Sequence, residues 1–372
     1  MSDTPHHTQD ALVTEVRVTK KERSEVELTG EIPVAILDTY KEQALARLAK
    51  DADVPGFRKG HVPPHVVEQR IDPVSLLREI AEDVLSNAYP ALVTEHALQV
   101  IGRPGVSLTQ VVPGNPVRFK IVTAVMPDIS LPDYQKIAAA HRKEPLDPNE
   151  FVVKDEEVEH VIRNIRQREA HAAKHEAHAG EQEPSQTDIP ESEWPEFTDA
   201  MAQKLGDFKN VDDFKNKIRA NIAKDKEQQA RDKKRGALIE KLIAGATIDV
   251  PEIFIQSELE NMAGEFKVQL ARMGLTWEGY LQHSGKSEEA IRDEWRTDAE
   301  KRAKLQLILN KIAEEESIAP DAAKIDTEVR HLMEHYPEAD EARARAYVES
   351  VEANRLVFAL LEDEVADTPK EE

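Results

Sequence analysis

The sequence predicts an α+β N-terminal domain followed by an extended, mostly α-helical domain. Three observations support this fold class. Apolar residues alternate with polar ones near the N-terminus and again around residue 120, which is typical of half-buried strands. From about residue 197 they recur at steps of three and four, which is typical of helices. The 372 residues also exceed what one ordinary core needs, so two or three domains are expected.

Composition and charge exclude several classes of protein. The chain contains no Cys, which excludes disulfides and a thiolate nucleophile and fits a reducing compartment. The net charge is -23, and residues 141–372 carry -19 of it, so general binding to RNA or DNA is disfavoured. The polar first ten residues do not fit a secretory signal, and no apolar run of about 18 residues predicts a membrane span. We therefore expect a cytoplasmic protein.

The N-terminal elements follow from a change of period. Residues 11–33 are predicted as β structure, and from Pro33 a helical pattern begins that stops before Pro55. The apolar residues that carry these patterns are Val16, Val18, Val26 and Leu28 for the strands and Leu37, Ala44, Leu45 and Leu48 for the helix.

A second helix is predicted to begin at Asp72-Pro73, because Asp is a good N-cap and Pro is favoured at the first helical position. Turn residues follow at Pro104-Gly105 and Pro113-Gly114, and the alternation over residues 117–125 predicts a half-buried strand. We place the resulting compact domain at residues 1–130.

The middle of the chain is predicted as a linker with a short helix, residues 131–195. Residues 127–150 contain several prolines and favour an extended conformation, and residues 155–172 favour a polar helix. Residues 171–195 are poor in apolar side chains, so we predict a solvated linker there.

The C-terminal part is predicted as a helical domain with arms, residues 196–365, followed by a disordered tail, residues 366–372. A polar run inside residues 211–243 leaves open whether one long helix or two fills that stretch. A further helix is expected to start at Pro251. The apolar faces of these helices are narrow, which favours an extended assembly over one thick core.

Two weak motifs are assigned to ordinary structure. Residues 285–287 (GKS) resemble the end of a P-loop, but the full spacing is absent, so we predict a turn between helices with Ser287 as N-cap. His171, His175 and His178 would share one helix face, but the segment lacks an apolar shell, so we assign no metal site. Without a nucleotide or hydrolase motif, we expect no cofactor, no ATP dependence and no catalytic residue.

The most informative stretch is VPGFRKGHVPP, residues 54–64. Its two glycines allow a tight turn, and its prolines favour extended backbone on both flanks. Phe57 in such a turn can hardly reach a core, so we expect it to be exposed or packed on a partner. Arg58 offers planar donors to a carboxylate or phosphate, and Lys59 offers a point charge. From the residues alone, a partner-binding loop and an ordinary loop between helices both stay open.

This loop resembles the ribosome-docking signature of bacterial trigger factors, G-F-R-K-G-x-V-P. It departs from the family at His61, where Lys is usual, and this weakens one cationic contact at neutral pH. Three more stretches are similar to family segments: VMPDISLPDY at residues 125–134, WPEFTDAMAQKLGDFKNVDDFKNKIRANI at 194–222, and IDVPEIFIQSELENM at 248–262. The resemblance covers about residues 10–365. It implies a ribosome-binding site made of Gly56, Phe57, Arg58, Lys59, Gly60 and His61.

One domain of the family is missing. Trigger factors normally carry a prolyl-isomerase domain of FKBP type between the linker and the helical domain. Here only residues 171–193 separate the polar helix from the returning helical pattern. That segment is too short to fold alone and contains no Phe or Tyr. We therefore expect a variant without the isomerase domain, and not an enzyme.

The resemblance implies an ATP-independent chaperone that docks near the exit tunnel of the large ribosomal subunit, on protein and rRNA, and binds nascent or unfolded polypeptides. Residues 1–130 would form the ribosome-binding domain and residues 196–365 the chaperone domain. Two alternatives stay open: a prolyl isomerase with a reduced or degenerate domain, and a non-catalytic helical scaffold. A homodimer away from the ribosome also stays open, and no membrane partner is expected.

Overall fold

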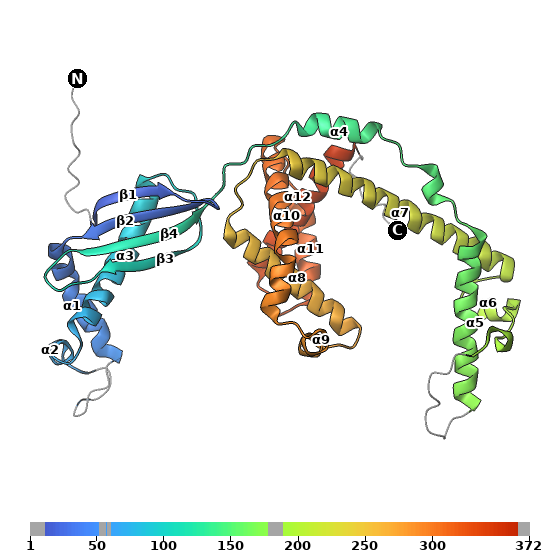
Figure 1. Cartoon of the computed structure of the whole chain (residues 1–372), viewed down its shortest axis with the longest axis horizontal. Coiled ribbons are helices and arrows are strands. Elements are labelled where there is room, and N and C mark those ends of the chain that lie inside the picture. The colour runs from blue at the N-terminus through green and yellow to red at the C-terminus, as the bar shows by residue number, and fades with distance from the viewer. Residues whose placement is uncertain (1–11, 52–56, 58–60, 178–188, 364–372) are drawn as a thin grey trace. The chain divides into compact units, whose positions relative to one another are not determined.

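The computed structural model describes residues 12–51, 57, 61–177 and 189–363 (Figure 1). It divides into two compact units. The first unit comprises Met1–Pro132 and Gly245–Asn354, and the second comprises Asp133–Ala244 and Arg355–Glu372. Each unit therefore combines stretches that are far apart in the sequence. The predicted domain limits at residues 130, 195 and 365 stay predictions.

A four-stranded antiparallel sheet forms the N-terminal part of the first unit. Its strands are β1 (Thr14–Lys20), β2 (Glu25–Ile32), β3 (Val100–Gln110) and β4 (Val117–Val125), in the order β1-β2-β4-β3. The strands predicted from the alternating pattern are confirmed as β1, β2 and β4. Every second residue of β2 is buried, so this strand presents one face to a core.

The sheet also contains a strand that the sequence does not predict. Pro104 and Gly105 are expected to form a turn, and this is wrong, because both lie inside the edge strand β3. The register of β3 against β4 shifts between Ile101 and Gly105. An edge strand tolerates proline because its outer side has no neighbour that needs the missing N–H, and an irregular register accommodates the extra residues.

Three helices complete this part of the first unit: α1 (Val34–Asp51), α2 (Pro64–Glu68) and α3 (Pro73–Glu95). The predicted cap of α3 is confirmed, since the Asp72 carboxylate accepts a hydrogen bond from the Ser75 N–H at 2.9 Å. The helices and the sheet share one core, whose buried members include Leu28, Ile32, Leu45, Val67, Ile80, Val84, Phe119 and Ile121.

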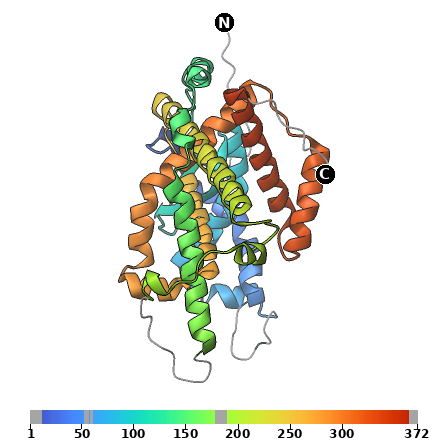
Figure 2. The same ribbon diagram turned by 90° about the vertical axis from the view of Figure 1, so that its right-hand side faces the viewer.

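The remaining helices of the chain's C-terminal part are α8 (Glu252–Arg272), α9 (Trp277–Ser284), α10 (Glu288–Glu315), α11 (Ala322–His335) and α12 (Glu341–Glu362). Figure 2 shows α11 and α12 side by side. The turn predicted at residues 285–287 is confirmed. Gly285 ends α9 with a φ of 67°, and the Ser287 hydroxyl accepts the Ala290 N–H at 3.2 Å. The core between α8 and α10 includes Val250, Ile255, Leu259, Ala299, Ala303 and Leu307.

The sheet contacts the start of α8 through polar groups. The Ser24 N–H donates to the Asp249 carboxylate at 2.8 Å. Arg23 and Arg296 both donate to the Glu252 carboxylate, at 2.8 and 2.5 Å. The hydrogen bond from Arg296, aided by Gln256 and opposed by partial burial, lowers the pKa of Glu252 below its ordinary value.

The second unit is built from α4 (Tyr134–Lys143), α5 (Asp155–Ala177), α6 (Asp199–Lys204), α7 (Val211–Gly245) and the end of α12, with short 3₁₀ turns at Pro148–Phe151 and Glu191–Glu193. The sequence leaves open whether one or two helices fill residues 211–243, and the structure has a single helix there, α7. A small core between α5, α6 and α7, the α5–α7 cluster, includes Val158, Ile162, Ala202 and Phe214.

Two predictions about the middle of the chain are wrong in part. Residues 127–150 are not extended throughout, because α4 forms there with Asp133 accepting the Lys136 N–H at 3.0 Å as its cap. Residues 171–195 are not solvated throughout either. Helix α5 continues to residue 177, Ile189 is 7% exposed, and the Trp194 indole donates to the Ile189 carbonyl at 2.9 Å. Residues 178–188 lie outside the described residues.

Candidate functional site

The predicted binding loop joins α1 to α2, and its C-terminal end is fixed on the core of the first unit. Val62 and Val67 are 4% and 7% exposed and belong to that core. Lys41 on α1 pairs with Glu68 on α2 at 2.6 Å, so the two helices are also held together at the surface. Two consecutive prolines, Pro63 and Pro64, start α2 and fix the backbone where the loop ends.

The structure describes two of the six predicted site residues. Phe57 is 42% exposed, so it is not folded into the core, as expected for a residue at such a turn. His61 is also exposed. Gly56, Arg58, Lys59 and Gly60 lie outside the described residues, and the assignment of the site stays a prediction.

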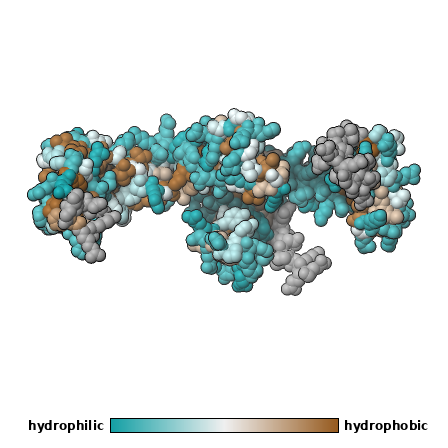
Figure 3. Space-filling view, turned by 90° about the horizontal axis from the view of Figure 1, so that it is seen from below, coloured by the Kyte–Doolittle hydropathy of each residue, from teal (hydrophilic) through white to brown (hydrophobic). Residues whose placement is uncertain are grey.

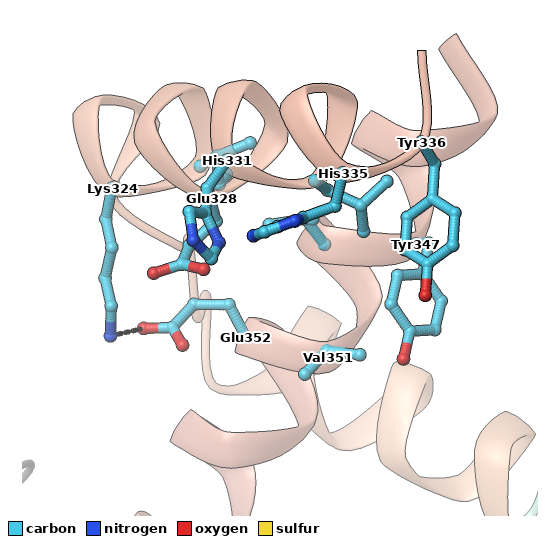
Figure 4. Close-up of a pocket in the computed structure, with 11 residues that line it drawn as sticks. Lys324, Glu328, His331, His335, Tyr336, Tyr347, Val351 and Glu352 are labelled. Atoms are coloured by element: carbon cyan, nitrogen blue, oxygen red, sulfur yellow. Dashed lines mark hydrogen bonds and ion pairs between the residues drawn. The ribbon is translucent and has the colours of Figure 1, made fainter. Parts of the chain in front are cut away.

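A second candidate surface is a groove of about 630 Å³ between α11 and α12 (Figure 4). Tyr336 and Tyr347 stand at one end of it. At the other end, the Lys324 ammonium donates to the Glu352 carboxylate at 2.8 Å. The apolar lining between these ends is Ile325, Leu332, Val348 and Val351.

The groove has the size and chemistry of a site for apolar side chains. Tyr336, Tyr347 and Val351 are 67%, 63% and 49% exposed. Tyr347 and Val351 lie on the face of α12 that lines the groove, and α11 leaves that face partly open. Its volume falls within the range of about 300–1,000 Å³ that is typical of ligand pockets. We call this surface, with the lining residues named above, the α11–α12 groove.

An aromatic cluster lies across α8, α9 and α10. The ring of Phe266 is 5.0 Å from Tyr280, 5.5 Å from Trp295 and 6.1 Å from Trp277, each in edge-to-face geometry. The exposed apolar residues beyond it are Val268, Met273 and Leu275. Met273, at the end of α8, is 59% exposed.

These apolar areas are dispersed. On the face shown in Figure 3, hydrophobic residues form small separate patches within a mostly hydrophilic surface. Small patches rimmed by charge fit several weak contacts better than one large permanent interface.

Metal-binding and membrane-spanning features are absent from the described part of the chain. Within it, no three His, Asp or Glu side chains are placed to hold a metal ion. His171 lies on an exposed face of α5, whereas the side chains of His175 and His178 are outside the described part. None of the described helices is both long and apolar enough to traverse a bilayer.

Two family models match the chain. The model for bacterial trigger factor protein (TF) matches residues 14–165, and the model for the C-terminus of the same protein matches residues 210–368. A curated trigger factor of Halalkalibacterium halodurans is 26% identical over 391 residues, which cover 85% of this chain and 89% of that protein. A trigger factor of Agathobacter rectalis is 26% identical over 402 residues, which cover 88% of this chain and 89% of the relative.

A solved structure described as "Promiscuous Substrate Recognition in Folding and Assembly Activities of the Trigger Factor Chaperone" also aligns with the chain. The alignment covers 94% of this chain and 100% of the other, with a TM-score of 0.49 and 17% identity.

The alignment lengths indicate that this chain is shortened inside. Because 85% of 372 residues is about 316, about 75 of the 391 aligned positions are residues of the H. halodurans protein without a counterpart here. The two family models leave residues 166–209 unmatched between them.

Proposed function

The chain belongs to the bacterial trigger factor family, and from this premise we propose that it is an ATP-independent, ribosome-associated molecular chaperone. It binds nascent or unfolded polypeptides at the exit tunnel in the cytoplasm and delays their misfolding. The observation that carries the proposal is the match of both family models, at residues 14–165 and 210–368, together with relatives aligned over 85–88% of the chain.

In this proposal the loop around Phe57 docks on the large ribosomal subunit. Phe57 fills an apolar niche, and Arg58 and Lys59 pair with carboxylates of ribosomal protein or phosphates of rRNA, with His61 beside them. Two features support this role: Phe57 is exposed, and the end of the loop is anchored on the core by Val62. Val62 thus fixes the chain on the core directly after the proposed docking residues.

The charge of the chain fits weak and reversible docking. A net charge of -23 repels rRNA overall, but screening over about 8 Å at physiological salt lets a small cationic loop act locally. With two or three phosphate contacts, the log–log slope of ribosome affinity against salt concentration is expected at about -2 to -3, at roughly 0.9 per contact. A slope near zero would contradict phosphate contacts.

The α11–α12 groove and the aromatic cluster supply the contacts to unfolded chains. Both offer aromatic and aliphatic surface that can contact apolar segments of many sequences. Each contact is weak, and several on one client raise the overall affinity. Surrounding ion pairs such as Lys324–Glu352 keep the groove flanked by charge.

We further propose that the chain has no prolyl-isomerase activity. The H. halodurans relative has about 75 residues without a counterpart here, and only residues 166–209 of this chain lie between the two regions that the family models match. A folding reaction limited by proline isomerisation tests this. The chain is expected to leave the slow rate unchanged, and acceleration at enzyme-like rates would overturn the proposal.

Suppression of the aggregation of a denatured substrate, without ATP, tests the chaperone activity. Wild type is expected to suppress aggregation, and a scaffold protein would not. Val351→Ser in the groove should weaken suppression, because it places a polar group among apolar residues. Val152→Ser is the matched control, since Val152 is 59% exposed outside the groove. Equal suppression by both variants would remove the groove from the proposal but not the chaperone function.

A further inference from the structure

A small polar cavity of about 260 Å³ lies within the second unit, where α4, α7 and the end of α12 meet (Figure 1). None of its lining residues belongs to the loop or to the groove described above. Its residues come from distant parts of the sequence: His141, Arg142, Leu146, Gln228, Arg231, Asp232, Lys234, Arg235 and Glu362.

The cavity is cationic in a chain that is strongly acidic. Four of its side chains are positively charged and two, Asp232 and Glu362, are negatively charged, so the lining carries a net charge of about +2 with His141 neutral. The whole chain carries -23. Gathering like charges from separate helices around one hollow is unfavourable unless an anion or carboxylates lie between them.

The protein's own contacts account for some of these cations but not all. The Arg235 guanidinium makes a two-pronged ion pair with Glu362, with Nε donating to Oε1 at 2.8 Å. Arg142 donates to the Leu360 carbonyl at 3.2 Å. Lys234 is half-buried and has no hydrogen bond or ion pair with the described residues.

His141 is the second group without a partner. Its side chain is 3% exposed, and its buried Nδ1 makes no hydrogen bond within the described part of the chain. Burial, followed by the charge of Lys234, lowers the pKa of His141, so the imidazole is neutral near pH 7. Leaving a buried ring nitrogen without a partner is costly, and a bound group with an oxygen acceptor would remove that cost.

We propose that this cavity binds a small anion bearing phosphate, such as diphosphate or a short phosphoester. Lys234 pairs with the phosphate, and His141 donates an N–H to one of its oxygens. Arg142 lies at the rim, as does Arg231, which also donates to Glu227 at 2.7 Å. The positive net charge of the lining favours a phosphate-bearing anion. Donors from separate helices suit a tetrahedral group, whose oxygens point in several directions.

The dimensions of the cavity favour a small ligand over a nucleic acid. Its volume lies below the range of about 300–1,000 Å³ typical of pockets for larger ligands. Asp232 and Glu362 at its edge would repel the neighbouring phosphates of a continuous polynucleotide backbone. A compact anion avoids them.

Isothermal titration of the full chain with diphosphate at low ionic strength tests the proposal. Wild type is expected to bind one equivalent saturably, with a dissociation constant below millimolar. Lys234→Gln should weaken binding at least about tenfold, since a hydrogen bond to a charged group is lost. Lys233→Gln is the matched control, because Lys233 is next in sequence but pairs with Glu150 at 2.8 Å and does not line the cavity.

An NMR titration of the histidine resonances of the wild-type protein supplies a second readout, which needs no substitution that could unfold the chain. Saturation with diphosphate is expected to raise the apparent pKa of His141, because an adjacent anion favours the protonated ring. An unchanged His141 resonance on saturation, equal weakening by Lys233→Gln and Lys234→Gln, or no saturable binding at millimolar diphosphate would each overturn the proposal. Binding of a short RNA that diphosphate fails to compete would overturn it too.

Discussion

Replacing Phe214 by Ala is expected to unfold the α5–α7 cluster while the sheet of the first unit stays intact. Phe214 is 3% exposed and is the largest side chain among the four buried residues of that cluster. Its ring lies 4.9 Å from Phe197 and 4.8 Å from Phe208. Removing it takes away the aromatic side chain through which α7 packs against Phe197 and Phe208, which flank α6.

The size of the effect follows from the burial of this ring. Truncating a buried Phe costs about 3–5 kcal/mol, which includes the lost aromatic pairs. A cluster with four fully buried residues has little further apolar core to offset this loss. A loss of about 4 kcal/mol raises the population of the open cluster roughly a thousandfold, at 1.4 kcal/mol per factor of ten. Ion pairs between α5 and α7, such as Lys215–Glu159, are exposed and too weak to compensate.

Native-state hydrogen exchange, followed by mass spectrometry of peptides, measures the stability of the α5–α7 cluster and that of the sheet separately. Amides of α5 and of the first half of α7 are expected to exchange up to about a thousandfold faster in Phe214→Ala. Amides of β2 and β4 should exchange as in wild type. Phe57→Ala is the matched control, because the same atoms are removed from a 42% exposed position and the stability should change by no more than about 0.5 kcal/mol.

Two outcomes would refute this reasoning. Equal loss of protection in β2 and α5 would mean that the two units unfold as one. Unchanged protection of α5 would mean that Phe214 does not hold the cluster together.

Glu252→Gln is expected to destabilise the first unit by about 1 kcal/mol at neutral pH, because Glu252 accepts a charged hydrogen bond from Arg296 at 2.5 Å. That bond lowers the pKa of Glu252 below its ordinary 4.5, so the stabilisation is present above pH 4.5 and is lost as the pH falls through the folded-state pKa. Urea unfolding of wild type and Glu252→Gln at decreasing pH checks this. A difference in unfolding free energy between the two proteins that does not change with pH would contradict it. Gly102→Ala should cost about 1–2 kcal/mol, since Gly102 has a φ of 72° and a Cβ there would meet Ile253 Cδ1 at 2.3 Å. Gly264→Ala, in open space on α8, should be neutral or stabilising in the same unfolding assay, and the reverse order would refute the reading of Gly102.

Local patterns predict local structure well in this chain. The alternation that predicts β2 and β4 arises because one face of each strand packs on α1 and α3. The caps at Asp72 and Ser287 are set by their own side chains and the next turn of backbone, so they are visible in a few residues. Strand β3 escapes prediction because Pro104 is tolerated only on an edge, and the edge position is a property of the whole sheet.

Features that depend on contacts between distant segments are not predictable from the sequence alone. The exposure of Tyr347 and Val351 depends on how α11 packs against α12, and nothing near these residues in the sequence shows it. The cavity at His141 is formed by α4, α7 and α12, and none of these segments has a motif of its own. The docking loop is different, because its role comes from a resemblance at residues 54–64.

Co-sedimentation with ribosomes tests the central claim, that the loop around Phe57 tethers this chaperone to the large subunit. A variant with Phe57→Ala, Arg58→Ala and Lys59→Ala is expected to lose at least about tenfold in affinity, since truncating a central aromatic or Arg typically costs 2 kcal/mol or more. The control carries Lys204→Ala, Leu205→Ala and Lys209→Ala, which remove two cations and a 44% exposed apolar residue elsewhere, and it should pellet like wild type. Equal pelleting of wild type and the loop variant would contradict the account.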